Sequence, residues 1–177
     1  MDQEGILNSA RLSIWLDTYD DIFSDFDSRD YPERALSDDF IHEARKMIKE
    51  KPDGQVELKL LMPEALRNPK TETIITNSIH RQFSHFARRI KTEMKNIRLQ
   101  GILMCAIGFV LMIIAAYLIT LINKIFYVSA LQVIIEPAGW FLVWTGFDHI
   151  FNSFRKRSPE YMFNKKMADS DIIFLSI

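Results

Sequence analysis

The chain has 177 residues, a formal net charge of −1 and a single cysteine. This length fits one compact domain, or a domain with an anchor. The near-neutral charge argues against a nucleic-acid binder, which normally carries a strong basic excess. One cysteine excludes an intramolecular disulfide and a cysteine metal cluster. The first residues are acidic, with no basic segment before an apolar core, so we expect no signal peptide and a cytoplasmic N-terminus.

The N-terminal part predicts two strands and a helix. Alternating apolar and polar residues indicate a strand over residues 11–18, and a loop rich in Asp and Ser follows. Ser37 is placed to cap a helix with apolar residues at helical spacing, namely Phe40, Ile41, Ala44, Met47 and Ile48. Residues 51–54 (KPDG) indicate a turn. Residues 55–62 then predict a second strand with one apolar face formed by Val56, Leu58 and Leu60.

A long amphipathic helix is predicted over residues 70–98. Its apolar residues step by three and four, as in a coiled coil: Ile75, Ile79, Phe83, Phe86, Ile90, Met94 and Ile97. This stripe needs a cover, which is either the small domain itself or another copy of the chain. Gly101 is the only weak helix former before the next apolar segment, so we expect the helix to continue into it.

Residues 101–122 predict a transmembrane helix. They carry no charge and would span about 33 Å as a helix, close to the hydrocarbon thickness of about 30 Å. Cys105 lies within this segment and is most simply a small apolar side chain facing lipid or a neighbouring helix.

A second span is predicted over about residues 128–151, and it is interrupted by Glu136 and Pro137. One arrangement is an entry turn at 127–135 followed by a membrane helix that starts at Pro137, where the missing N–H is tolerated. A continuous, kinked helix is the other, and an interfacial or re-entrant helix is a third alternative. The polar gap around Asn123 and Lys124 suits the connection of a hairpin.

Flanking charges predict the orientation of this hairpin. Six basic residues lie in 81–98 and five in 155–166, whereas the connection has only Lys124. By the positive-inside rule both termini face the cytoplasm. We therefore expect a prokaryotic inner (cytoplasmic) membrane protein in contact with membrane lipid.

The C-terminal tail, residues 152–177, ends in the apolar segment 171–177 (DIIFLSI). We predict that it returns to the sheet as a third strand; a disordered tail is the alternative. The expected fold is therefore an α+β membrane protein. Its parts are a cytoplasmic α/β domain of two or three strands (1–98), a transmembrane hairpin (101–151) and the tail. Because the core of such a domain is thin, a homo-oligomer or a partner in a membrane complex would support it.

Three segments resemble an uncharacterised family of prokaryotic two-span integral membrane proteins. They are residues 20–40 (DDIFSDFDSRDYPERALSDDF), residues 56–68 (VELKLLMPEALRN) and the second span with Glu136, Gly139, Trp140 and Trp144. The resemblance covers most of the chain. It implies the two-span topology and no mechanism, because the family has no assigned activity. The family pattern has Gly after the membrane glutamate, where this chain has Pro137.

The acidic loop is the first candidate site. It carries Asp20, Asp21, Asp25 and Asp27, with Arg29 and Arg34 as adjacent ion partners. Asp25-x-Asp27 begins like a calcium loop, but the glycine is missing and Leu36 stands where a bidentate Glu is needed. We therefore expect no metal site. A structural Asp/Arg network or a docking surface is the preferred interpretation.

Glu136 is the second candidate, because a carboxylate within an apolar span marks an ion path or pairs with a partner. A structural cap, a hydrogen bond between subunits and a role in transport all remain open. The chain has no Gly-rich phosphate loop, nucleophile elbow or HExxH motif, so we expect neither an enzyme nor a cofactor. The leading hypothesis is a structural or scaffold subunit that oligomerises or docks a partner through its cytoplasmic domain. The alternatives are a small oligomeric ion channel or membrane effector with Glu136 near the pore and, third, a lipid- or signal-responsive regulator.

Overall fold

The computed structural model describes residues 10–50, 56–121 and 126–176, and it is mostly helical with a small parallel sheet. The chain divides into two compact units. Unit 1 comprises Met1–Arg88 and Glu160–Ile177, and unit 2 comprises Arg89–Pro159. The predicted turn at 51–54 and the hairpin connection at 122–125 lie outside the described residues.

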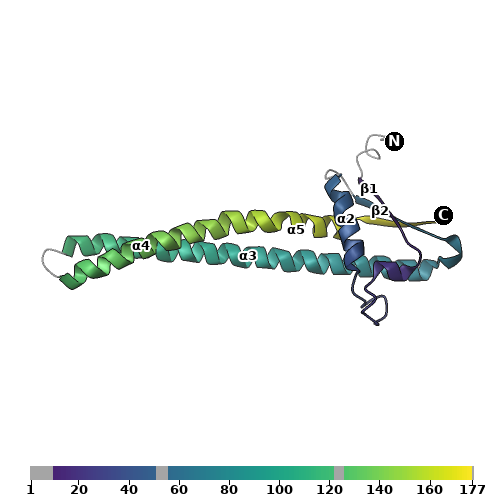
Figure 1. Cartoon of the computed structure of the whole chain (residues 1–177), viewed down its shortest axis with the longest axis horizontal. Helices are drawn as coiled ribbons and strands as arrows, with labels where there is room; N and C mark the ends of the chain where they lie inside the picture. The colour runs from purple at the N-terminus through teal and green to yellow at the C-terminus, as the bar shows by residue number, and fades with distance from the viewer. Residues whose placement is uncertain (1–9, 51–55, 122–125, 177) are drawn as a thin grey trace. The chain divides into compact units, whose positions relative to one another are not determined.

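Three parallel strands form the sheet of unit 1, in the order β1-β2-β3 (Figure 1). They are β1 (Ala10–Trp15), β2 (Val56–Met62) and β3 (Asp171–Ser176). The predicted third strand is therefore confirmed. The first strand ends earlier than predicted, because the backbone N–H groups of Asp17 and Thr18 turn to the carboxylate of Asp21 (2.7 and 2.9 Å). This bend leads into the 3-10 turn η1 (Tyr19–Ile22).

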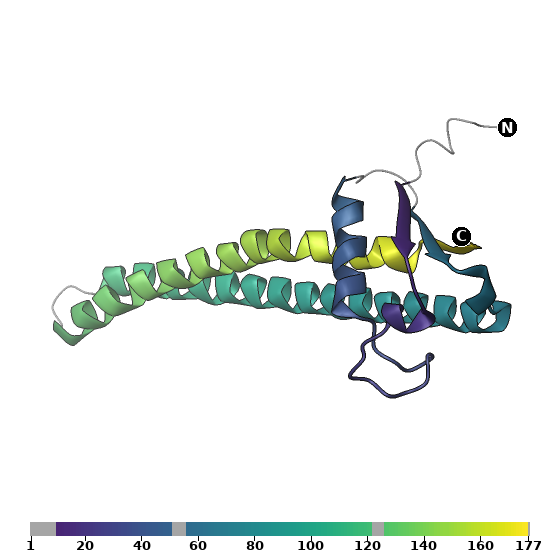
Figure 2. The same cartoon turned by 45° about the vertical axis from the view of Figure 1, so that its right-hand side comes forward.

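Three helices cover one face of this sheet. They are α2 (Asp38–Glu50), the first part of α3 (Pro69–Leu121) and the end of α5 (Phe154–Ala168). Figure 2 shows α2 running across the other two. A short 3-10 turn, η2 (Glu64–Leu66), links β2 to α3. The sequence did not predict α5, whose residues were assigned to the tail.

The core of unit 1 lies between that sheet face and the helices. The inward residues of β2 are fully buried, as the predicted strand face requires: Val56, Leu58, Leu60 and Met62. Helices α2, α3 and α5 supply the opposite side: Phe40, Ala44, Ile48, Ile75, Ile79, Phe83, Phe163 and Met167. The other sheet face is more open, and Trp15 on it is 61% exposed. The sheet is thus covered by helices on one side.

Helix α3 is a single helix of 53 residues, which confirms the predicted continuity between the amphipathic and apolar segments. Pro69 occupies its first turn, and the side chain of Asn68 accepts a hydrogen bond from the N–H of Lys70 (3.0 Å). Most of the predicted stripe is buried, but Ala87 takes the place of Phe86, which is 37% exposed. Since Ile75, Ile79 and Phe83 belong to the core of unit 1, the chain itself covers this part of the stripe.

Unit 2 contains the rest of α3 and the apolar helix α4 (Phe126–Asp148), followed by a π-helical turn, η3 (His149–Ser153). Of the arrangements left open for this segment, the entry turn at 127–135 is not formed, because α4 runs through Pro137 without a break. The proline removes one hydrogen bond to the carbonyl of Val133, a loss that long apolar helices tolerate. The continuous-helix alternative is therefore the one observed.

Glycines bring α3 and α4 into close contact. A Cβ atom built on Gly108 would lie 2.7 Å from the carbonyl oxygen of Gly139, and one on Gly101 would lie 2.8 Å from that of Gly146. Gly101 and Gly108 are seven residues apart in α3, and Gly139 and Gly146 are seven residues apart in α4. The contacts between the two helices therefore repeat every two turns. Such small residues let helix backbones pack directly on each other.

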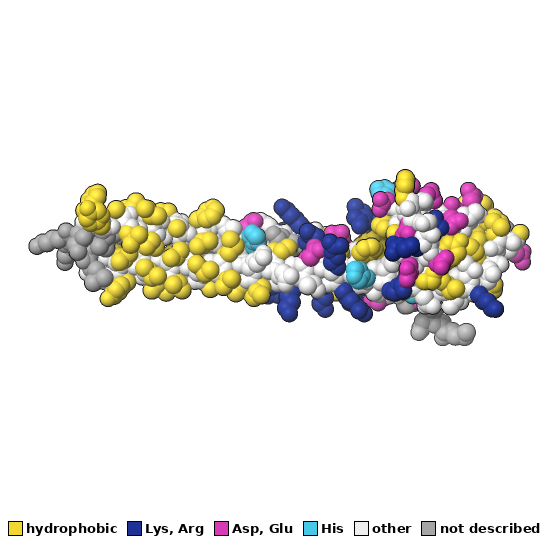
Figure 3. Space-filling model, turned by 90° about the horizontal axis from the view of Figure 1, so that it is seen from below, with side chains coloured by type: hydrophobic (Ala, Val, Ile, Leu, Met, Phe, Trp, Pro, Cys, Tyr) yellow, Lys and Arg dark blue, Asp and Glu magenta, His cyan; other side chains and the backbone are white. Residues whose placement is uncertain are grey.

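Most large apolar side chains of α4 and of α3 beyond residue 101 point outward instead. Figure 3 shows them in yellow over the hairpin. The most apolar window of the first helix is only 11% buried within the chain, and that of the second is 17% buried. Both helices are long and apolar enough to cross a membrane. A core helix of a soluble protein would be mostly buried, so this exposure favours membrane association.

Candidate functional site

The acidic loop of unit 1, residues 19–36, is held together by its own carboxylates. Asp27 receives two hydrogen bonds from the guanidinium of Arg29 (2.9 and 2.7 Å) and one from the backbone N–H of Ala35 (2.8 Å). These bonds hold the pKa of the Asp27 carboxyl well below its usual range, with Arg29 as the largest cause. The fork-like pairing fixes the orientation of the Arg29 side chain.

Arg34 binds the other end of the loop. Its guanidinium pairs with Asp20, lies 4.0 Å from Asp25 and donates to the carbonyl of Ser24 (3.1 Å). It also stacks over the ring of Phe23, at 5.9 Å from the centroid. Asp21 is separate from this group, since it accepts from backbone N–H groups at the start of the loop. Among the described residues, no three His, Cys, Asp or Glu side chains gather as a metal site would require.

Two polar residues of α3 attach the loop to the helix. Gln82 donates to the carbonyl of Arg34 (2.7 Å) and accepts from the N–H of Leu36 (3.2 Å). Ser78, which is buried, donates to the carbonyl of Pro32 (3.2 Å). The loop is therefore fixed against one face of α3 by three hydrogen bonds, in addition to its internal ion pairs.

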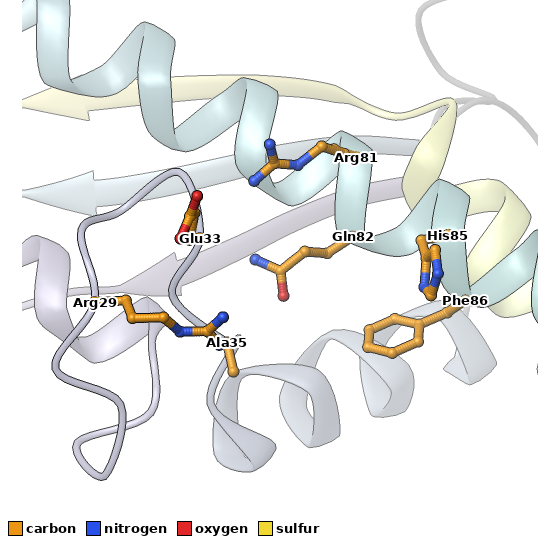
Figure 4. A pocket seen from close by; sticks show the side chains of 7 residues that line it. All are labelled: Arg29, Glu33, Ala35, Arg81, Gln82, His85 and Phe86. Carbon is orange, nitrogen blue, oxygen red and sulfur yellow. The ribbon is translucent and has the colours of Figure 1, made fainter.

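A pocket of about 420 Å³ lies between the loop and α3. Figure 4 shows its walls, with loop side chains on one side and α3 side chains on the other. We call it the loop pocket; it is lined by Arg29, Glu33, Ala35, Arg81, Gln82, His85 and Phe86. The rings of His85 and Phe86 meet edge to face, with centroids 6.3 Å apart.

Sequence reasoning identified only Arg29 among the residues that line this pocket. The four residues from α3 are 46 to 57 positions from the loop, so no local spacing relates the two walls. Phe86 was counted in the apolar stripe. His80 and His85 do not form a common site. His80 contacts the carbonyl of Ser170 through Nε2 (2.9 Å), whereas His85 lines the pocket.

Glu136 is in unit 2 and remote in sequence from the acidic loop. It is exposed and lies near the middle of α4, three residues before the buried Gly139. The carboxyl is thus beside the glycine contact with α3 rather than inside it. Its neighbours on the helix surface, Val133 and Trp140, are also exposed.

The comparisons with known proteins found no match: no family model, no curated protein and no solved structure is similar to the chain. The resemblance to two-span membrane proteins therefore stays a prediction.

Proposed function

We propose that the chain is a membrane-anchored structural or scaffold subunit that self-associates within the bilayer. In this proposal the hairpin of α3 and α4 spans a prokaryotic inner membrane, and unit 1 lies on the cytoplasmic side with both termini. The exposed apolar surface of unit 2 supports the membrane location. A group of exposed basic residues next to that surface supports the orientation: Arg89, Lys91, Lys95, Arg98, Arg155, Lys156 and Arg157.

The observation that carries this proposal is the exposed position of Glu136. About 15 Å of helix precede it in α4 and about 18 Å follow it, so it would lie near the middle of the membrane. An acidic side chain there is unfavourable by about 2.5–3.5 kcal/mol on insertion scales. Within one chain, α3 packs against the face of α4 that carries Gly139 and Gly146, and the Glu136 side chain stays exposed. A second hairpin on this flank would shield the carboxyl and accept or donate a hydrogen bond.

Self-association through the cytoplasmic helix has less support. The stripe that motivated it contributes Ile75, Ile79 and Phe83 to the chain's own core. A second copy is not needed to cover these residues. The proposal therefore places the contact between copies in the hairpin, and it leaves unit 1 free to dock a partner.

The test is the subunit number of the full chain in nanodiscs, measured by mass photometry. We expect a defined oligomer for the wild type and a shift to smaller particles for Glu136→Leu. Glu136→Gln should retain most of the assembly, because an amide can still hydrogen-bond between helices. One such bond is worth about 1 kcal/mol, or about fivefold in the dissociation constant. The control is Phe141→Leu, an exposed position on another face of α4. A wild-type particle that contains one chain would overturn the proposal.

The same carboxyl supports a second candidate function, a small oligomeric ion channel or membrane effector. One hairpin cannot enclose a pore, so this function also needs several copies. A carboxylate that faces a water-filled path would be ionised and would attract cations. Ion flux into liposomes separates the two functions. A channel predicts flux for the wild type and a clear reduction for Glu136→Gln, whereas a scaffold predicts none for either.

A further inference from the structure

The loop pocket combines cationic donors with an aromatic wall, and neither is used by the proposed self-association. Its volume of about 420 Å³ lies within the range of small-molecule sites, about 300–1,000 Å³. The two walls come from elements joined by the hydrogen bonds of Ser78 and Gln82, so the pocket exists without a ligand. Sites that bind small molecules are usually formed in advance in this way.

Two arginines face the pocket from opposite walls. Arg29 is held in one orientation by its paired bonds to Asp27, which occupy two of its five N–H donors. Arg81 is exposed and makes no hydrogen bond or ion pair with any other residue that the structure describes. Figure 4 shows both side chains together with the ring of His85. A planar guanidinium with free donors matches the oxygens of a phosphate group.

The remaining lining indicates what else the ligand carries. Phe86 is 37% exposed where it lines the pocket, whereas the stripe residues Ile75, Ile79 and Phe83 on the same helix are fully buried. An aromatic face of this kind stacks with a planar ring. Glu33 can accept hydrogen bonds from a hydroxyl or amino group on the same molecule. The lining thus offers partners for a phosphate, a ring and a donor group.

We propose that the loop pocket binds a small phosphomonoester with a planar ring, of the mononucleotide class. A lipid headgroup is a less suitable source of the phosphate. Phe86 precedes Gly101, where the apolar segment begins, by fifteen residues, which is about 22 Å of continuous helix. A headgroup at the membrane surface would not reach that far along α3, whereas a soluble ligand would.

The experiment uses the full chain in nanodiscs of a zwitterionic lipid and measures binding by isothermal titration calorimetry. The probes are adenosine 5′-monophosphate, adenosine and inorganic phosphate. The nucleotide should bind at least about tenfold more tightly than either of its parts.

Arg81→Ala should weaken nucleotide binding about tenfold and leave adenosine binding unchanged. Phe86→Ala should weaken nucleotide and adenosine binding but not phosphate binding. Both substitutions are at exposed positions, so circular dichroism should be unchanged.

Arg98→Ala is the matched control, since Arg98 is another exposed arginine on α3 but lies outside the pocket. It should bind the nucleotide like the wild type. Equal losses for Arg81→Ala and Arg98→Ala would overturn the proposal, because they would reflect charge alone. Equal affinity for adenosine and its monophosphate would do the same, as would no binding at about 10 mM nucleotide. The last measurement repeats the nucleotide titration in nanodiscs that contain phosphatidylglycerol. Loss of nucleotide binding in these nanodiscs would show that a lipid headgroup occupies the pocket instead. Failure of self-association would leave all these expectations unchanged.

Discussion

Helix α3 passes through both units and is packed differently in each. In unit 1 its buried positions carry large side chains, such as Ile79 and Phe83, which fill a core beneath the sheet. In the apolar part of unit 2, from residue 101 onward, its buried positions carry Gly101, Gly108 and Ala115, and large side chains such as Ile113 point outward. The first pattern is that of a helix in water, where burial of apolar surface stabilises the fold. The second is expected where the surroundings are themselves apolar and close backbone contact replaces that driving force.

The first prediction tests the packing in unit 1, and it is the largest effect. Phe83 is fully buried and meets Phe163 edge to face at 5.8 Å. Phe83→Ala should destabilise unit 1 by about 3–5 kcal/mol, because it removes apolar burial and leaves a cavity. Hydrogen exchange of the β2 amides measures this loss. The control Trp15→Ala, at an exposed position of β1, should change stability by no more than about 0.5 kcal/mol. Equal losses of stability for Phe83→Ala and Trp15→Ala would contradict the place of Phe83 in the core.

The second prediction tests the contact between α3 and α4. A Cβ on Gly108 would meet the backbone of Gly139 and Val143 at 2.7–2.9 Å, so a larger residue forces the helices apart. Gly108→Leu should destabilise the hairpin by about 1–3 kcal/mol. Ala116→Leu adds a similar side chain at an exposed position of the same helix and serves as the control. Resistance to unfolding by sodium dodecyl sulfate is the measurement. If both variants unfold alike, the glycine contact does not hold the hairpin.

Sequence patterns predicted best where one physical rule acts alone. Charge-free length predicted the apolar part of α3, alternation predicted β1 and β2, and a short apolar segment predicted the third strand. Pro137 left two arrangements open, because a proline that marks a helix start in water is also tolerated inside a long apolar helix. Helix α5 was not predicted, because its segment is rich in charge and contains Pro159. In addition, it places only Phe163 and Met167 in the core, and two residues are too few for a recognisable helical stripe.

The glycine contact and the loop pocket show two further limits. The seven-residue spacing of Gly101 and Gly108, repeated in Gly139 and Gly146, was present in the sequence and could have indicated the helix contact. The loop pocket left no such signal. Its walls meet only because Gln82 and Ser78 bind loop carbonyls, and a hydrogen bond across 46 or 48 residues has no local pattern. The candidate site was thus predicted in part, through Arg29 and the acidic loop.

The third prediction concerns an ion pair at the start of α3 and is the smallest effect. Arg67 donates two hydrogen bonds to Glu72 (2.8 and 3.0 Å), and the hydroxyl of Tyr19 lies 3.2 Å from the same carboxylate. These bonds, with that of Arg67 the largest cause, hold the pKa of Glu72 below its ordinary value of 4.5. A depressed carboxyl pKa stabilises the fold above the unfolded pKa, and the stabilisation is lost as the pH falls through the folded pKa.

Glu72→Gln should therefore reduce the stability of unit 1 at pH 7 by about 1 kcal/mol or less, since the pair is partly exposed. As the pH falls from 4.5 through the lower pKa of folded Glu72, the difference in stability between wild type and variant should narrow, because the wild-type carboxyl becomes protonated over this range. Thermal unfolding at several pH values measures both effects. Glu43→Gln on α2, where the carboxylate is 48% exposed and 4.0 Å from Lys46, is the control and should follow the wild type. A constant gap for Glu72→Gln at all pH values would show that its hydrogen bonds, and not its charge, matter. In that case uncharged hydrogen bonds would stabilise the margin of unit 1 around its apolar core, a kind of contact different from the close backbone packing of the hairpin.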